Sequence, residues 1–299
     1  MKQEMSVKQT AGSADQAKIE QWVASHDSDA LYGALSDEFQ AQITLKDLKE
    51  LLESFWMKDE QLQLMSSHIL PDQQMLTWSD PSETKGISLT IHHGVIVYMV
   101  FQPLEQHASD QKLTSNSFRP PFEGDWFVFW GGTNVLQNYH YEHPSQRYAY
   151  DYIILKDGSS FSGDPLLNES YYAFGQKVLA PADGIVVAAE SSIADNQPVS
   201  KMNTEQPAGN YIVIDHGHDE YSIIAHLKQD SVRVKPGEHV AAGQWIGDTG
   251  NSGNSSEAHI HFQISNHTDL FAGESIRIQF EDGSSPVQYD TVTGLPAGE

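Results

Sequence analysis

The sequence of 299 residues contains no cysteine. Disulfide bonds, zinc sites with cysteine ligands and thiol nucleophiles are therefore excluded together. A metal site in this chain can be built only from histidine, aspartate and glutamate, and 14 histidines are present to supply imidazole ligands. The lack of cysteine thus removes thiolate ligands from any metal site in this chain.

Basic residues are also scarce. Lysine and arginine number 17 against 41 acidic residues, which gives a formal net charge of -24. A surface this acidic repels nucleic-acid phosphates and anionic lipids, so we expect no nucleic-acid partner. No stretch approaches the ~20 apolar residues that a membrane-spanning helix requires, so we expect no membrane insertion either. The composition indicates no oligomeric state.

A long apolar run is likewise missing from the N-terminus. Residues 1–12 are polar and contain no apolar segment of signal-peptide length. Two expectations stay open: a protein that remains in the cytoplasm, or a mature chain from which an export signal has been removed.

What the chain does have is the composition of a packed protein, with 39% hydrophobic and 19% charged residues. Its length favours two domains over one. A polar, flexible tail is expected over residues 1–14. After it, apolar residues recur at helical spacing: Ile19, Trp22, Leu31, Leu35 and Phe39. In a second helix, a capping-box pattern of Thr44 and Asp47 precedes an apolar stripe: Leu45, Leu48, Leu51, Leu52, Phe55 and Trp56.

Strands are expected after these helices, with the last two joined in a hairpin at His93 and Gly94. Their expected ranges are Gln61–Leu70, Gln74–Ser79, Gly86–His92 and Val95–Gln102. Helices followed by antiparallel strands describe a small α+β domain over residues 15–106. In element order it resembles the NTF2-like/cystatin-like accessory domains found ahead of some secreted bacterial hydrolases. The pair His92-His93 suggests a metal site, but a hairpin end is solvated, so we expect ordinary surface side chains there.

Residues 107–119 are rich in Ser, Asp, Asn and Gln and show no period, so we expect a linker. A fragment that begins near Phe118 is therefore expected to fold by itself. From residue 120 to 299, short β-rich runs alternate with Gly, Pro and Asn: Trp126–Trp130, Tyr148–Leu155, Lys177–Glu190, Asn210–His216, Tyr221–Leu227 and His259–Ser265. This second domain is predicted to be all-β and antiparallel, either a sandwich or a distorted barrel.

The stretch Ala258–Ser265 alternates polar and apolar residues. His259, His261 and Gln263 share one face, which is typical of a half-buried β-strand with one polar side. Two imidazoles on the same face point toward one place. Such a pair suits a metal ligand beside a catalytic partner, because a neutral imidazole binds zinc, accepts a proton or donates a hydrogen bond.

Further ligands are available in three other stretches. His140 and His143 precede Asp151, and His226 ends a predicted strand. A mononuclear catalytic zinc needs about three protein ligands and one position open for water. Additional neutral imidazoles orient that water and stabilise the oxyanion that forms when it attacks a carbonyl.

Residues from about 120 to 283 resemble the lysostaphin/LytM-type zinc endopeptidases, which cut peptidoglycan peptides. The match is carried by the number, order and spacing of short motifs. These are Lys177-Val-Leu-Ala-Pro-Ala-Asp-Gly184, Asn210-Tyr-Ile-Val-Ile-Asp-His-Gly217, Ala225-His226-Leu227, Val234-Lys-Pro-Gly237, Ala242-Gly-Gln-Trp-Ile-Gly247, Gly250-Asn-Ser-Gly253 and His259-Ile-His261.

The resemblance implies that His140, Asp151 and His261 bind Zn²⁺ and that His226 and His259 are the catalytic pair. It further implies hydrolysis of cell-wall peptides and an extracytoplasmic or envelope location. The commonest family pattern separates the first histidine from the aspartate by four residues, whereas here they are eleven apart, so His143 is a rival to His140 as first ligand. Four aromatic residues belong either to the substrate groove or to the core: Trp130, Tyr139, Tyr141 and Trp245.

Two other functions compete with this one. The Ala-Pro-Ala-Asp-Gly and Val-Lys-Pro-Gly segments also resemble lipoyl and biotinyl carriers, which modify a lysine at a hairpin tip. Lys201-Met202 lies in a polar loop without that frame, which disfavours a carrier. The second alternative is a catalytically inactive LytM-like regulator or binding protein of another wall hydrolase. All five site positions are filled in this sequence, which favours an enzyme.

Overall fold

A computed structural model describes residues 14–70 and 72–295 of the protein. The predicted tail therefore lies outside the described residues, except for Ala14, whose backbone N–H donates to the Gly94 carbonyl at 2.8 Å. The chain forms two compact units, Met1–Glu105 and Gln106–Glu299. None of the helices in the described ranges is long and apolar enough to cross a membrane.

The helices of the first unit begin at side-chain caps. They are α1 (Gln16–Ser25), α2 (Ser28–Gly33), α3 (Asp37–Gln40) and α4 (Leu45–Phe55). The predicted capping box at the start of α4 is present, with Thr44 Oγ1 accepting from the Asp47 backbone N–H at 3.1 Å. The pattern expected as one helix from Ile19 to Phe39 is divided in three, because Asp27 and Ser36 each cap a new start.

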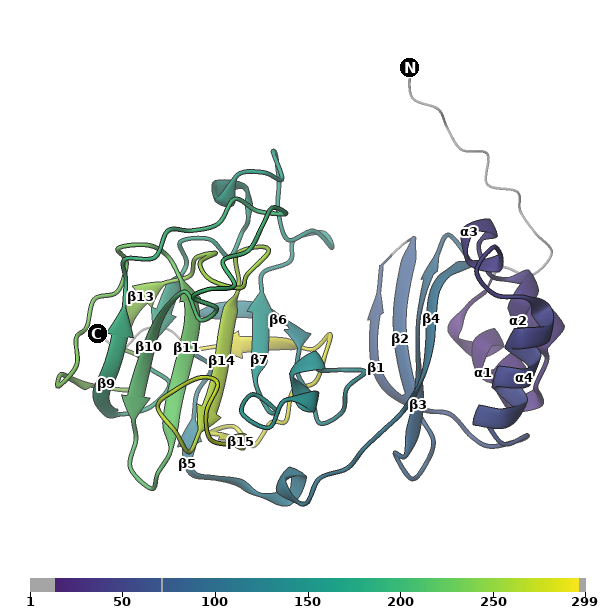
Figure 1. The fold of residues 1–299 in the computed structure, drawn as a ribbon, viewed down its shortest axis with the longest axis horizontal. Helices are drawn as coiled ribbons and strands as arrows, with labels where there is room; N and C mark the ends of the chain where they lie inside the picture. Colours follow the sequence, from purple (N-terminus) through teal and green to yellow (C-terminus); the bar gives the residue numbers. More distant parts are fainter. Residues whose placement is uncertain (1–13, 71, 296–299) are drawn as a thin grey trace. The chain divides into compact units, whose positions relative to one another are not determined.

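An antiparallel sheet completes the first unit. Its order is β1 (Gln63–Ile69), β2 (Gln73–Ser79), β3 (Lys85–His92) and β4 (Val95–Pro103). The helices lie along one face of this sheet (Figure 1), and the core between them includes Leu48, Leu52, Trp78 and Leu89. The hairpin predicted at His93 and Gly94 joins β3 to β4, with φ values of 49° and 78° at these two residues.

The second unit is built on one large, mainly antiparallel sheet. Its strands are β5 (Leu113–Phe118), β6 (Gly124–Trp130), β7 (Tyr150–Ile153), β8 (Lys177–Leu179), β9 (Gly184–Glu190), β10 (Asn210–Asp215), β11 (Tyr221–Leu227), β12 (His239–Val240), β13 (Trp245–Asp248), β14 (Ile260–Ser265), β15 (Ser275–Phe280) and β16 (Thr291–Gly294). The prediction of an α+β unit followed by an antiparallel β-rich unit is confirmed.

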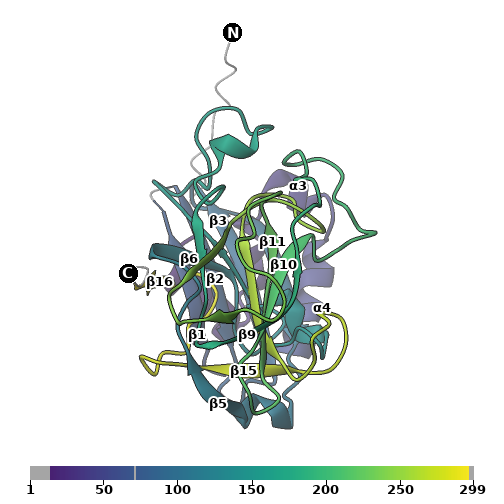
Figure 2. The ribbon, with the colours of Figure 1, turned by 90° about the vertical axis from the view of Figure 1, so that its left-hand side faces the viewer.

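The main path of the sheet runs β12-β9-β10-β11-β14-β7-β6-β16. In the described residues its two end strands do not pair with each other, so this sheet does not close into a barrel. Strand β15 pairs with the end of β14 and then runs across the foot of the sheet (Figure 2), while β8 and β13 form a separate two-stranded sheet.

The stretch 107–119 differs from the linker expected there. It contains a 3₁₀ helix, η1 (Ala108–Gln111), and the strand β5, which pairs in parallel with β15. Glu220 accepts hydrogen bonds from the backbone N–H groups of Ser115 and Asn116. Long-range pairing of this kind leaves no periodic signal in a short polar segment. For this reason the sequence did not indicate that β5 is a strand of the second unit.

Strand β14 lies between β7 and β11 and is buried along its whole length. The alternation predicted for it is present, but the exposed polar face is not. The side chain of Gln263 donates to the Ser145 carbonyl at 2.9 Å, because the loop before β7 covers this face. A polar face that is covered in this way is a site where buried polar groups need partners.

Candidate metal centre

Two of the predicted ligands face each other across neighbouring strands. His261 on β14 and Asp151 on β7 are direct partners in the antiparallel register, although 110 residues separate them. His261 Nδ1 lies 3.0 Å from Asp151 Oδ1. The opposite ring nitrogen, Nε2, lies 3.0 Å from Gln263 Oε1.

The proton on His261 can be placed from these partners. The amide nitrogen of Gln263 donates to the Ser145 carbonyl, so its Oε1 must be the atom that faces His261. An amide oxygen only accepts, and the Nε2 of His261 therefore carries the proton. In the neutral ring, Nδ1 is left with a lone pair directed at a carboxylate.

His140 approaches the same carboxylate from a different element. It lies in the 3₁₀ helix η2 (Tyr139–Glu142), and its Nε2 is 3.6 Å from Asp151 Oδ2. Its Nδ1 lies 2.9 Å from Asn138 Oδ1. The Asn138 amide nitrogen donates to backbone carbonyls, including that of Ala149 at 3.0 Å, so its oxygen must face His140. The Nδ1 of His140 is therefore the protonated nitrogen, and Nε2 presents a lone pair.

This group of three residues fits a bound cation. Two imidazole lone pairs face the oxygens of one carboxylate, and these acceptor atoms would repel one another without a positive charge between them. His140, Asp151 and His261 are 1%, 5% and 2% exposed, and their ligand atoms lie within 4.8 Å of one another. Two imidazoles with one carboxylate, and a further partner for each imidazole, are the donor set of a zinc site.

The pKa values in the group favour the ligating forms. Burial lowers the pKa of His140 to about 3, against the opposing attraction of the Asp151 charge. Burial by itself would raise the pKa of Asp151, but the neighbouring imidazoles, His140 first, lower it overall. A neutral His140 and an ionised Asp151 are the protonation states that bind metal.

Two further histidines border this group. His226 is the last residue but one of β11 and His259 directly precedes β14, with ring centroids 4.7 Å apart. Their Nδ1 atoms each lie 2.9 Å from a backbone carbonyl oxygen, that of Ser252 for His226 and that of Glu257 for His259. A carbonyl only accepts, so both rings carry the proton on Nδ1 and have a free lone pair on Nε2. His259 Nε2 lies 3.8 Å from Asp151 Oδ1.

The backbone of His226 is strained. Its φ is 62°, a left-handed conformation that non-glycine residues adopt at a cost of about 1–3 kcal/mol. The residue is 7% exposed, and burial lowers its pKa well below the ordinary value. Strain held by surrounding contacts at a buried, neutral imidazole is a common feature of functional sites.

Two adjoining hollows open at the group and share Tyr139 and Asn254. The first is bordered by His140, His226 and His261, and the second by Asp151 and His259. Four aromatic residues were expected to line either the substrate groove or the core. Two of them, Tyr139 and Trp130, line the second hollow. Tyr141 is 3% exposed and belongs to the packed interior, and Trp245 borders neither hollow.

The structure brings five predicted residues together: His140, Asp151, His226, His259 and His261. His143, the rival first ligand, is an exposed residue at the end of η2 and does not belong to the group of three. The sequence pattern did not indicate the supporting roles of Asn138 and Gln263. The available signal was their position two residues from a histidine, which on a strand or tight turn puts both side chains on one side.

The fold and this group of residues define a β-rich domain with a candidate metal centre. Residues 170–273 match the profile of Peptidase family M23. The lipoprotein NlpD of Yersinia enterocolitica is 34% identical over 90 residues, which cover 30% of this chain and 77% of that protein. The chain therefore belongs to peptidase family M23. The matched range contains His226, His259 and His261 and begins after His140 and Asp151.

Two longer relatives match over a smaller share of their length. The peptidoglycan DD-endopeptidase ShyA of Vibrio cholerae serotype O1 is 34% identical over 90 residues, covering 30% of this chain and 17% of that protein. The murein hydrolase activator NlpD of Escherichia coli K12 is 36% identical over 90 residues, covering 30% and 20%. The chain spans about a fifth of the length of the first curated relatives it matches.

Among solved structures, the catalytic domain of lysostaphin from Staphylococcus simulans is 19% identical, covers 57% of this chain and 95% of its own, and has a TM-score of 0.29. The catalytic domain of the M23 protein EnpA from Enterococcus faecalis is 21% identical, covers 42% and 89%, and has a TM-score of 0.28. The family assignment rests on the sequence matches.

Proposed function

We propose that this chain is a zinc-dependent endopeptidase that hydrolyses peptide bonds of bacterial cell-wall peptidoglycan. The observation that carries the proposal is the pair of imidazole lone pairs, on His140 Nε2 and His261 Nδ1, that face the carboxylate of Asp151. Membership of a peptidase family supports a hydrolase. The name of the relative ShyA supports peptidoglycan as substrate and an envelope location.

His140, Asp151 and His261 would hold the zinc ion and leave a coordination position open. Zinc supplies Lewis acidity, which polarises a carbonyl and lowers the pKa of water. Asn138 and Gln263 hold the two imidazoles in the tautomers that ligate.

His226 and His259 would move and hold the protons. Their Nε2 lone pairs would accept hydrogen bonds from the attacking water. These hydrogen bonds orient the water oxygen toward the scissile carbonyl. As the C–O bond forms, the water proton passes to Nε2 of His259, whose positive charge is favoured by Asp151 at 3.8 Å. The new N–H stabilises the tetrahedral oxyanion and then gives its proton to the leaving amine as the C–N bond breaks.

The test is digestion of purified peptidoglycan by the zinc-loaded protein, with mass analysis of the released fragments. We expect fragments that differ by cleavage of one defined peptide bond, and none from His261→Ala or from protein stripped of metal by a chelator. His143→Ala serves as a matched control, since it removes an exposed neighbouring histidine. Equal cleavage by the wild type and by His261→Ala would rule the proposal out.

A second candidate function is a non-catalytic activator of another wall hydrolase. The observation in its favour is the match to the murein hydrolase activator NlpD of Escherichia coli. An activator would release no fragments by itself and would increase the fragments released by a partner hydrolase. The same digestion, with and without such a hydrolase, separates the two functions.

The unit that precedes this domain is proposed to be an accessory domain of the NTF2-like/cystatin-like kind. Its four-stranded sheet with helices along one face supports that proposal. The domain boundary is proposed at Glu105–Gln106, where the two compact units meet along the chain.

A further inference from the structure

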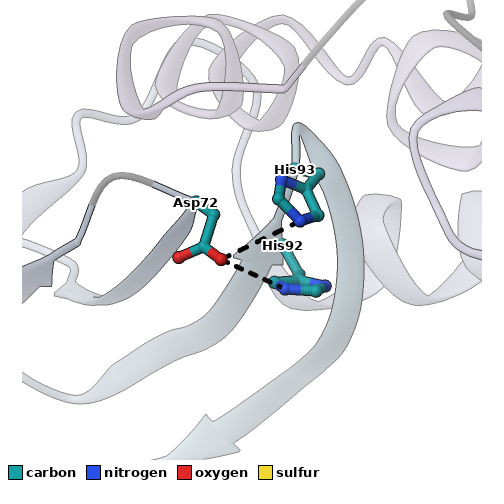
Figure 3. A group of neighbouring side chains, drawn as sticks. All are labelled: Asp72, His92 and His93. Carbon is teal, nitrogen blue, oxygen red and sulfur yellow. Dashed lines mark ion pairs between the residues drawn. The ribbon is translucent and has the colours of Figure 1, made fainter. Parts of the chain in front are cut away.

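A second group of potential ligands lies in the first unit, whose residues take no part in the candidate centre. Asp72, His92 and His93 are exposed, and their ligand atoms lie within 4.8 Å of one another. His92 Nε2 and His93 Nε2 are 3.9 and 3.8 Å from the same atom, Asp72 Oδ2. Figure 3 shows both rings directed at that one oxygen.

The turn explains how two consecutive residues reach the same point. Neighbouring residues of a strand normally point to opposite faces. His93 has φ 49° and is the first residue of the tight turn after β3, so the chain reverses there and the rings come within 4.3 Å, centroid to centroid. Asp72 is held against this turn by its carbonyl, which accepts from the His93 backbone N–H at 2.7 Å.

Surface ion pairs do not account for this arrangement. Exposed histidine–carboxylate pairs contribute little to stability. Two protonated imidazoles at 4.3 Å would also repel each other. A cation between neutral rings and the carboxylate removes that repulsion and uses all three groups.

The distances are within reach of a coordination sphere. With bond lengths of about 2.0–2.1 Å, the donor atoms of a tetrahedral zinc site lie roughly 3.3–3.4 Å apart. The observed separations of 3.8 and 3.9 Å close to this value through small rotations of exposed side chains. Imidazole nitrogens select zinc, copper, nickel or iron over calcium and magnesium, which prefer oxygen ligands.

We propose that Asp72, His92 and His93 form a surface binding site for a divalent transition-metal ion such as Zn²⁺, with water in the remaining position. The proposal replaces the expectation that His92 and His93 are ordinary solvated side chains. That expectation lacked Asp72, which the register of β2 against β3, with Gln73 opposite His92, brings to the turn.

The experiment is a Zn²⁺ titration of the full, metal-stripped chain by calorimetry, with bound metal counted after dialysis at fixed free zinc. We expect the chain to bind a second equivalent of Zn²⁺ in addition to the one at the candidate centre. The affinity for this second Zn²⁺ should fall by more than ~10-fold in His92→Ala, His93→Ala and Asp72→Asn. His239→Ala, which removes another exposed histidine, should leave both equivalents unchanged. Histidine ring signals in NMR spectra should show His92 and His93 shifting with that equivalent.

His261→Ala separates the two sites. If the surface site exists, this variant keeps one equivalent, and His92→Ala then removes it. Loss of all zinc binding in His261→Ala would overturn the proposal, as would a second equivalent that none of the three surface substitutions weakens. Zinc that is retained in His261→Ala and lost in His92→Ala would support the surface site even if the candidate centre failed.

Discussion

The hydroxyl of Tyr148 lies 2.7 Å from Oδ1 of Asp110, and the other oxygen of the same carboxylate accepts from the Tyr141 hydroxyl at 2.8 Å. Asp110 is 7% exposed and comes from the stretch that the sequence suggested as a linker. Tyr141 directly follows His140, so this carboxylate anchors the loop that carries the first potential ligand. Burial and the Asp110 contact raise the pKa of both tyrosines, which keeps their hydroxyl protons available as donors.

This anchoring predicts where the second unit can be cut. A fragment that begins at Gln106 should fold with a cooperative thermal transition, because it retains β5 and Asp110. The start near Phe118 that the sequence suggested is replaced by this boundary: a fragment that begins at Arg119 should melt at a distinctly lower temperature or fail to fold, since it loses the β5–β15 pairing and leaves two buried hydroxyls without their acceptor. Circular dichroism on both fragments checks this. Equal melting temperatures would show that residues 106–118 are dispensable.

The assigned roles predict that substitution of His261, on β14, and of His259, directly before β14, will have different effects on zinc binding and on rate. His261→Ala should abolish zinc binding at the candidate centre, because it removes a ligand. His259→Ala should retain that zinc and lower the rate by roughly 10²–10³, the usual effect of removing a stabilising group from the transition state. Metal analysis and peptidoglycan cleavage, measured on the same preparations, check the pair. Equal zinc loss in both variants would contradict the roles.

The first ligand is tested by the two histidines around η2. His140→Ala should greatly weaken zinc binding at the centre, because His140 Nε2 is directed at Asp151. His143→Ala should leave the affinity unchanged, because its side chain is exposed. Zinc titration of both variants decides the matter. The reverse outcome would transfer the ligand to His143.

Asn138 should act on the metal through His140. Asn138→Ala removes the acceptor at 2.9 Å from His140 Nδ1, and loss of such a partner typically lowers metal affinity by about 10–100-fold. Asn254→Ala is a suitable control, since Asn254 borders both hollows without a hydrogen bond to a ligand ring. Zinc affinity is the measurement, and unchanged affinity in Asn138→Ala would show that the backbone alone orients the ring.

Acid should destabilise the metal-free protein through His140. Burial lowers its pKa to about 3 in the folded state, against an ordinary value near ~6.5 in the unfolded chain. The unfolded state therefore binds more protons than the folded state between these two pH values. The contribution of His140 to the free energy of unfolding is fully present above pH ~6.5 and is lost as the pH falls toward 3. One such group contributes up to about 1.4 kcal/mol per pH unit. Urea unfolding of wild type and His140→Gln from pH 7 to 4 should give a shallower slope for the variant, and parallel slopes would contradict this.

Local features of this protein were determined by the sequence. The capping box of Thr44 and Asp47 and the turn at His93 and Gly94 depend on backbone conformations a few residues long, so residue type was sufficient to predict them. The same holds for the common face of His261 and Gln263, which follows from the two-residue period of a strand.

Only the tertiary structure decided which residues meet. The register of β7 against β14 places Asp151 opposite His261, and the register of β2 against β3 brings Asp72 to the histidine turn. Pairing between strands far apart in the chain depends on how both are packed, and a polar strand such as β5 carries no periodic signal of its partner. For the same reason the sequence indicated a half-exposed strand at β14, whereas a loop that folds over the sheet buries its polar face.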